Sequence, residues 1–201
     1  MIQVITPATT SDLTTTDALR AALGSPPLTD AEVTELRQIV ARASDLATRF
    51  CARTTFGRET VRQTERLTSS ARVIILQRDL APAITSVTVD GLALASADYE
   101  LDGALLYRLD SSGYRTTWDA GIAIITYAAG YTQLTDLPFD VEAAAIEIGK
   151  ALWAGRGRDP SVRSDAVQGV VNISYHDARD GHGGLPAIAA EMLAPWRAFC
   201  V

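Results

Sequence analysis

The chain of 201 residues has few of the residues and segments on which several common protein classes depend. Its two cysteines, Cys51 and Cys200, are too few for the disulfide framework of a small secreted protein, so we expect free thiols of a cytosolic protein. Cys51 ends an apolar helical face, which favours its burial. No apolar run reaches the roughly 20 residues that span a bilayer. The threonine-rich start lacks the basic and apolar regions of a secretion signal, so we expect no membrane partner.

The chain also lacks an excess of basic residues. Its formal net charge is −6 and its isoelectric point about 4.9. Broad, sequence-independent binding of nucleic acid needs a basic face, and this balance argues against it. A local basic patch remains compatible with the same total.

Catalytic signatures are scarce as well. The only two histidines, His176 and His182, share a glycine-rich stretch with Asp177 and Asp180, and these four residue types can ligate a metal. Their spacing matches no established metal motif, and the sequence contains no G-x-S-x-G. We therefore expect no catalytic residue, no metal and no cofactor. A small metal-dependent hydrolase that uses these four residues is the alternative from another functional class.

A basic loop at 155–158, with the sequence GRGR, has glycines and arginines of the kind that bind phosphate. No GK[ST] follows it, and it leaves the C-terminal end of a predicted helix, where the helix dipole repels anions. We instead expect Arg156, Arg158 and Arg163 to pair with carboxylates of a partner or to face DNA. A solvated charged loop explains them equally well.

The apolar content predicts a folded globular chain, since 47% of the residues are hydrophobic and 21% are charged. Thr29 and Glu32 fit a capping box, and apolar residues follow at helical spacing, which predicts a long helix over about 30–53. Before it, residues 1–14 have few apolar anchors and suggest a loose arm. Residues 17–23 suggest a short helix that ends at Gly24.

From residue 57 to 130 the pattern changes to short strands. Asp90-Gly91 and Asp102-Gly103 each separate two apolar runs, as in tight β-hairpins. Residues 122–127 are a further strand, whereas 58–68 alternate weakly, as an exposed strand does. This region predicts a small antiparallel sheet or barrel inserted between helices.

A second helix is predicted over about 138–154, with Asp136 as its cap, Pro138 in its first turn and Gly155 at its end. Its small face of alanines allows close approach to the long helix. Residues 155–167 suggest a charged loop and 169–175 an extended segment. A last helix over about 186–198 should be shortened or kinked by Pro195.

The end of the chain carries large apolar groups that one subunit alone has difficulty covering. Leu193, Trp196 and Phe199, with Arg197 between them, are therefore candidates for contact with a partner. Packing of the same residues onto the two long helices is the alternative. Together the elements predict an α+β fold, a helical bundle with an inserted β region.

The order and spacing of several segments resemble those of head–tail connector (adaptor) proteins of tailed phages and of phage-derived gene transfer agents. The segments are 50–56 (FCARTTF), 82–91 (PAITSVTVDG), 124–131 (IITYAAGY), 137–138 (LP), 184–186 (GLP) and 193–197 (LAPWR). The resemblance covers residues 28–200. It implies one connector domain over 28–201, with a helical core at 28–56 and 136–201 and a β-rich insertion at 57–131. The N-terminal arm at 1–27, with its short helix, is not part of the resemblance.

The resemblance also implies a structural role without catalysis. Proteins of this kind form a ring, typically twelvefold, beneath the portal protein of the head. They extend the DNA channel without sequence-specific binding and dock the next neck or tail component, the stopper. It implies a place in the virion neck, after assembly in the bacterial host cytoplasm. A neck stopper or tail-completion protein is the nearer alternative.

Overall fold

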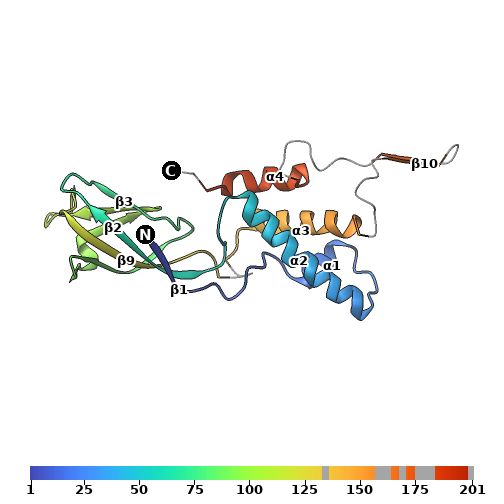
Figure 1. The fold of residues 1–201 in the computed structure, drawn as a ribbon, viewed down its shortest axis with the longest axis horizontal. Coiled ribbons are helices and arrows are strands. Elements are labelled where there is room, and N and C mark those ends of the chain that lie inside the picture. Colours follow the sequence, from blue (N-terminus) through green and yellow to red (C-terminus); the bar gives the residue numbers. More distant parts are fainter. Residues whose placement is uncertain (133–135, 157–163, 168–170, 175–183, 199–201) are drawn as a thin grey trace. The chain divides into compact units, whose positions relative to one another are not determined.

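A computed structural model of the chain describes residues 1–132, 136–156, 164–167, 171–174 and 184–198 (Figure 1). Its contacts divide the chain into two compact units. The first, here called the β unit, contains Met1–Thr10 and Thr55–Asp136. The second, the helical unit, contains Ser11–Thr54 and Leu137–Val201. The main antiparallel sheets and the helices belong to different units, which confirms the predicted α+β class.

In the helical unit, two of the four helices found among the described residues contact all the others. Its helices are α1 (Thr16–Ala22), α2 (Asp30–Phe50), α3 (Phe139–Ala154) and α4 (Ala187–Leu193), followed by a 3₁₀ turn, Ala194–Trp196. α3 contacts α1, α2 and α4, and lies beside α2 in Figure 1. Of the alanines predicted to allow this close packing, Ala144 and Ala145 are fully buried and Ala143 is half-buried. A Cβ added at Gly149 would lie 3.0 Å from Leu19 of α1, so a small residue there permits the close approach.

The helix ends follow the predicted signals in part. Thr29 and Glu32 form the capping box, so α2 begins where expected. It ends at Phe50 rather than near residue 53, and Ala52 just beyond has a left-handed φ of 53°. α3 begins at Phe139 after Pro138, and Pro138 itself occupies the cap position without a side-chain hydrogen bond, so the prediction of Asp136 as cap was wrong. α4 stops at Leu193, two residues before Pro195, as a proline there favours.

Two antiparallel sheets make up the β unit. The first has the order β1-β2-β9-β4-β5, and the second β3-β7-β6 with β8 paired to β7. The strands are β1 (Ile2–Thr6), β2 (Glu59–Leu67), β3 (Val73–Ile75), β4 (Ala83–Val89), β5 (Leu92–Ala93), β6 (Tyr99–Asp102), β7 (Leu105–Leu109), β8 (Arg115–Thr116) and β9 (Gly121–Ala129), with a 3₁₀ turn at Ser96–Asp98. Both sheets contribute to one apolar core, which includes Val61, Ile74, Val87, Leu106, Trp118 and Ile125. Asp90 and Gly91 have φ values of 48° and 81°, so the predicted primed turn joins β4 to β5.

Two strands differ from the prediction. Residues 2–6 form β1 at the edge of the first sheet, where a loose arm was expected. β2 lies between β1 and β9 rather than on the outside, and buries Glu59, Val61 and Gln63 on one face. The sequence does not indicate this burial, because polar residues at buried positions of β2 weaken the alternation of hydrophobicity.

A short hairpin, β10 (Ser164–Val167) with β11 (Val171–Ser174), forms a separate two-stranded sheet. β11 lies within the segment predicted to be extended, while β10 occupies part of the predicted charged loop. No helix in the described ranges is long and apolar enough to cross a membrane.

Candidate assembly interface

The predicted interface residues that the structure describes all belong to the helical unit. Arg156 follows α3 and lies 3.8 Å from a carboxylate oxygen of Glu32 and 3.6 Å from one of Glu35. Its guanidinium also stacks on Trp153, 3.3 Å from the ring centroid. The Thr29 backbone N–H and hydroxyl at the cap lower the pKa of Glu32, and the charge of Arg156 adds to this effect. Arg156 therefore joins the end of α3 to the start of α2.

Arg156 nevertheless remains partly accessible, with 35% of its side chain exposed. An arginine held in one orientation by an aromatic ring and two carboxylates loses little freedom when it binds a further acid. The other two arginines of the predicted set, Arg158 and Arg163, lie outside the described residues.

The C-terminal residues turn back onto the end of α2. Leu193 is fully buried, and its carbonyl oxygen accepts from the thiol of Cys51 at 3.7 Å. The Trp196 carbonyl oxygen accepts from Nε of Arg53 at 2.6 Å. The Arg197 guanidinium lies 5.4 Å from the Phe50 ring centroid. Of the two interpretations left open by the sequence, packing within the chain thus holds for Leu193, while Trp196 is half-buried and Arg197 exposed.

Cys51 sits at the centre of this contact. It is a buried free thiol, as expected, and its carbonyl oxygen accepts from the N–H of Ala198 at 2.8 Å. Burial raises the pKa of Cys51 to about 11, against the opposing charges of Arg53 and Arg197. A thiol of this kind is a poor nucleophile at neutral pH. Phe199 and Cys200 lie outside the described residues.

The four residues of the alternative metal site, His176, Asp177, Asp180 and His182, also fall outside the described residues. Within the described ranges, no three His, Cys, Asp or Glu side chains are grouped so that they could hold a metal ion.

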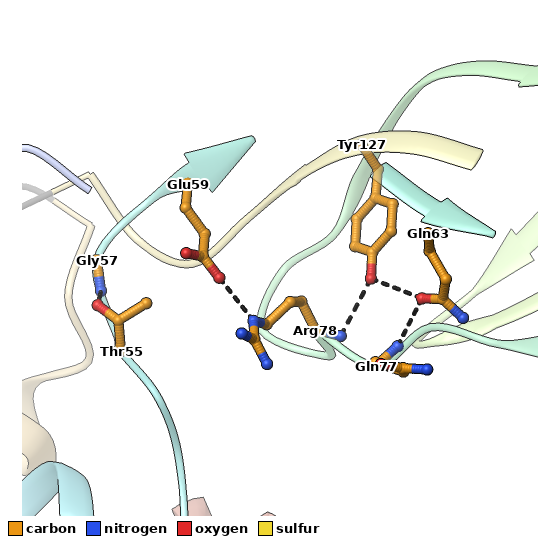
Figure 2. Close-up of polar contacts among 7 residues, drawn as sticks. All are labelled: Thr55, Gly57, Glu59, Gln63, Gln77, Arg78 and Tyr127. Carbon is orange, nitrogen blue, oxygen red and sulfur yellow. Dashed lines mark hydrogen bonds and ion pairs between the residues drawn. The ribbon is translucent and has the colours of Figure 1, made fainter. Parts of the chain in front are cut away.

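A buried polar cluster in the β unit was not anticipated from the sequence. Figure 2 shows the Tyr127 hydroxyl between the main chain of Arg78 and the side chain of Gln63. Gln63 Oε1 accepts from Tyr127 and from the N–H of Gln77, both at 2.9 Å, and Gln63 Nε2 donates to the Ile75 carbonyl oxygen at 2.8 Å. Beside them, Arg78 Nε donates to Glu59 Oε1 at 2.6 Å.

This cluster fixes the segment between β3 and β4 rather than forming a reactive centre. Gln63 and Tyr127 are fully buried, and the hydrogen bonds between their side chains and the nearby backbone satisfy polar groups that burial would otherwise leave unpaired. Burial is also the main reason that the pKa of Tyr127 is raised. The Tyr127 hydroxyl is thus protonated near neutral pH and is used in the two hydrogen bonds to Gln63 and Arg78. The signal in the sequence was the period-two placement of Glu59, Val61 and Gln63.

Glycines permit a tight crossing elsewhere in the β unit. Gly57 pairs with Tyr131 in an isolated parallel bridge, and its N–H donates to the Thr55 hydroxyl at 2.9 Å (Figure 2). Gly130 has a φ of 94°, and a Cβ on it would collide with the Gly57 carbonyl oxygen. A Cβ on Gly57 would lie 2.8 Å from that of Ala8. Three segments distant in sequence therefore approach one another without side chains between them.

No protein-family model and no curated protein matches the sequence. Solved structures do match it. A chain in the neck of an empty gene transfer agent (GTA) particle, computed with C6 symmetry, superposes with a TM-score of 0.57 at 15% identity. A chain in the virion of a native GTA particle gives 0.55 at 16% identity. Each match covers 100% of this chain and 97% of the other.

This chain has the fold of a GTA neck protein. The neck fold spans both units, because the matches extend over the whole chain. A third chain, from the neck of a native GTA particle computed with C12 symmetry, agrees with a TM-score of 0.50 at 16% identity. The resemblance suggested by the sequence is thereby confirmed at the level of the fold.

Proposed function

We propose that this protein is a structural subunit of the neck of a tailed phage or gene transfer particle. The observation that carries the proposal is the completeness of the match, since chains from a GTA neck and a GTA virion match 100% of this chain, including both of its units, over 97% of their own length. A fold alone does not determine a function, but a whole-chain match of this architecture to particle components favours assembly over catalysis. The Arg156 contacts and the buried Cys51 thiol fit this role, as neither presents a reactive group.

Within the neck, the position we propose is that of the head–tail connector (adaptor). Copies of the chain form a ring, of twelve in our proposal, beneath the portal protein, and the stopper docks on its other side. Ring formation is supported by the C6 and C12 symmetries of the structures in which similar chains occur. DNA passes through the lumen without sequence-specific contact. An acidic total charge of −6 suits such passage, because it does not hold the phosphates. The ring would be assembled in the bacterial host cytoplasm.

The partner contacts we propose are those of the arginines after α3 and of the C-terminal segment. Arg156, with Arg158 and Arg163, would meet carboxylates of a neighbouring subunit or of the portal. Trp196, Arg197 and Phe199 would meet the portal, while buried Leu193 holds the segment in place from inside the helical unit. In functional terms, residues 28–201 act as one connector domain whose insertion at 57–131 is completed by β1 from the N-terminal arm.

Electron cryo-microscopy of particles that carry a tagged copy of the chain tests the position. The proposal expects density for the tag at the junction of head and tail, and DNA-filled heads without tails when the gene is deleted. A tag located on the capsid or along the tail would refute the neck role. Pull-downs then separate the adaptor from the stopper: an adaptor binds purified portal directly. A chain that binds only tail components would be a stopper or tail-completion protein.

A further inference from the structure

On the outer edge of β1, a run of backbone groups has no partner strand among the described residues. β1 is paired with β2 on one side, and among the described residues no strand flanks the other. The Thr64 N–H donates to the Met1 carbonyl oxygen, and the Met1 amine donates to the Thr64 carbonyl oxygen, each at 2.8 Å. Backbone N–H and C=O groups point alternately to the two sides of an antiparallel strand. Those of Gln3 therefore also face β2, whereas those of Ile2 and Val4 point outward.

The edges formed by β6 and β3 of the second sheet are protected more fully. β6 carries two acids, Glu100 and Asp102, that pair with Arg115. The edge of β3 is occupied by the Gln63 side chain, which binds the Ile75 carbonyl oxygen. Charges and coverings of this kind are how proteins prevent edge strands from pairing with other chains.

β1 has no charged residue in its sequence IQVIT, and only a bulge between Val4 and Thr6 limits its length. The opposite edge of the same sheet is half open. β5 pairs only with Thr88 and Val89 of β4, which leaves Ala83–Ser86 without a neighbouring strand among the described residues. This stretch is also uncharged, and Ala83, Thr85 and Ser86 are exposed. A bulge between Ile84 and Ser86 interrupts it, so both open edges offer short segments of similar length.

Strand direction makes these two edges complementary. The strands β1, β2, β9 and β4 alternate in direction, since every neighbouring pair is antiparallel. β1 and β4 therefore run in opposite directions. A second copy placed beside the first in the same orientation would bring its β4 antiparallel to β1. Repetition of one such head-to-tail contact is what closes a cyclic ring.

The apolar residues agree with this arrangement. Val4, Val61, Tyr127 and Ile84 form one row across the core face of the sheet. Val61 and Tyr127 are fully buried, but Val4 at the end of the row is 42% exposed, since no further strand of the described ranges lies beside it. Ile84 from a second copy, placed opposite Val4, would continue the row and cover the exposed part.

We propose that β1 of one copy pairs antiparallel with Ala83–Ser86 of the next, so that the first sheets of neighbouring subunits join into one continuous sheet around the ring. The inference rests on the ring proposed above and identifies the contact that closes it. The occupant of the β1 edge is thus a second copy of this chain.

Disulfide cross-linking in assembled particles tests the contact. If Val4 lies opposite Ile84, then Gln3 lies opposite Thr85, at a site where facing Cα atoms are about 4.5 Å apart, within the range that a disulfide spans. In a Cys200→Ser background, the double variant Gln3→Cys/Thr85→Cys should give a ladder of covalent oligomers under oxidising conditions, and neither single variant should. Dimers from Gln3→Cys alone would mean that β1 pairs with β1 about a two-fold axis, and would overturn the proposal.

A second pair of variants tests the backbone directly. Val4→Pro removes an outward N–H that β2 does not use, whereas Val4→Thr keeps that N–H and the branched shape. Val4→Pro should weaken each contact by about tenfold, equivalent to roughly 1.4 kcal/mol, and reduce incorporation into particles. Val4→Thr should be incorporated as the wild type, and circular dichroism should show both variants folded. Equal incorporation of the two folded variants would refute the pairing. If the double-cysteine chain does not enter particles, the comparison of the two Val4 variants is the deciding test.

The tagged wild-type chain separates this inference from the function beneath it. A tag at the neck, with no ladder and no effect of Val4→Pro, would overturn the edge pairing alone. A tag elsewhere in the particle would overturn the neck role as well.

Discussion

Replacement of Leu193 by alanine tests whether the C-terminal segment belongs to the core of the helical unit. Leu193 is fully buried on α4, which contacts both α2 and α3. Leu193→Ala removes three buried carbons and leaves a cavity, for which leucine-to-alanine changes typically cost about 2–5 kcal/mol. Because the backbone carbonyl that contacts Cys51 is retained, we expect a loss near the middle of this range, about 3 kcal/mol.

Ile188→Ala is the matched control on the same helix. Ile188 is 51% exposed, so its truncation should lower the free energy of unfolding by less than about 1 kcal/mol. Hydrogen exchange followed by mass spectrometry is the suitable assay, because peptides from α2 and α3 report on the helical unit and peptides from β9 on the β unit. A loss of about 3 kcal/mol should accelerate exchange in α2 and α3 by roughly 100-fold and leave β9 unchanged.

The result that would refute this reasoning is equal exchange in the two variants. If Leu193→Ala exchanged like Ile188→Ala but failed to join particles, Leu193 would be a partner contact rather than a core residue. The packing described for α4 would then be wrong.

Three further predictions concern the remaining sites. Gln63→Leu should lower the free energy of unfolding, measured in urea, by about 2–4 kcal/mol, because Tyr127 and two backbone groups lose their hydrogen-bond partner. Arg62→Ala, at an exposed position of the same strand, should change it by less than about 0.5 kcal/mol. Equal effects of the two variants would count against the cluster. Alkylation of Cys51 at pH 8 should be about 100-fold slower than that of a thiol of ordinary pKa, from the thiolate fraction alone. Folding raises the pKa of Cys51 from 9.0 to about 11, so the protonated thiol contributes its full share to the free energy of unfolding below pH 9 and loses it as the pH rises to 11. If the pH dependence of unfolding were unchanged in Cys51→Ala, this reasoning would be wrong. Arg156→Ala should cost less than about 1 kcal/mol of stability, since the ion pairs are partly exposed, yet weaken binding to purified portal; unimpaired binding would remove Arg156 from the interface.

Local signals in the sequence were sufficient for much of the fold. Thr29 and Glu32 satisfy the first-turn amides of α2 by themselves, so the start of this helix depends on nothing far away. The Asp90-Gly91 turn is similar, because its left-handed φ angles are a property of these residues. Such features are readable from a few consecutive residues.

The features that were missed depend on residues far apart in the sequence. Gln63 appears unsuited to a core strand until Tyr127 and the segment after β3 supply its hydrogen bonds. β1 has few apolar residues of its own and becomes a strand because β2 offers it an edge more than fifty residues later. The interface could be predicted only as a list of residue types: Leu193 and Trp196 are equally apolar in the sequence, and only the folded chain shows that one is buried and the other half-buried.

The interleaving of the two units has a consequence for how the chain is made. β1 is synthesised before β2, with which it pairs, and β2 in turn pairs with β9, whose residues follow after residue 120. α2 likewise cannot complete its packing until α3 and α4 have been synthesised. A nascent chain shorter than about 130 residues therefore has no complete β unit, and the helical unit cannot close before α4 is synthesised. Such a high contact order slows folding, which makes this protein a candidate for chaperone assistance before it joins any assembly.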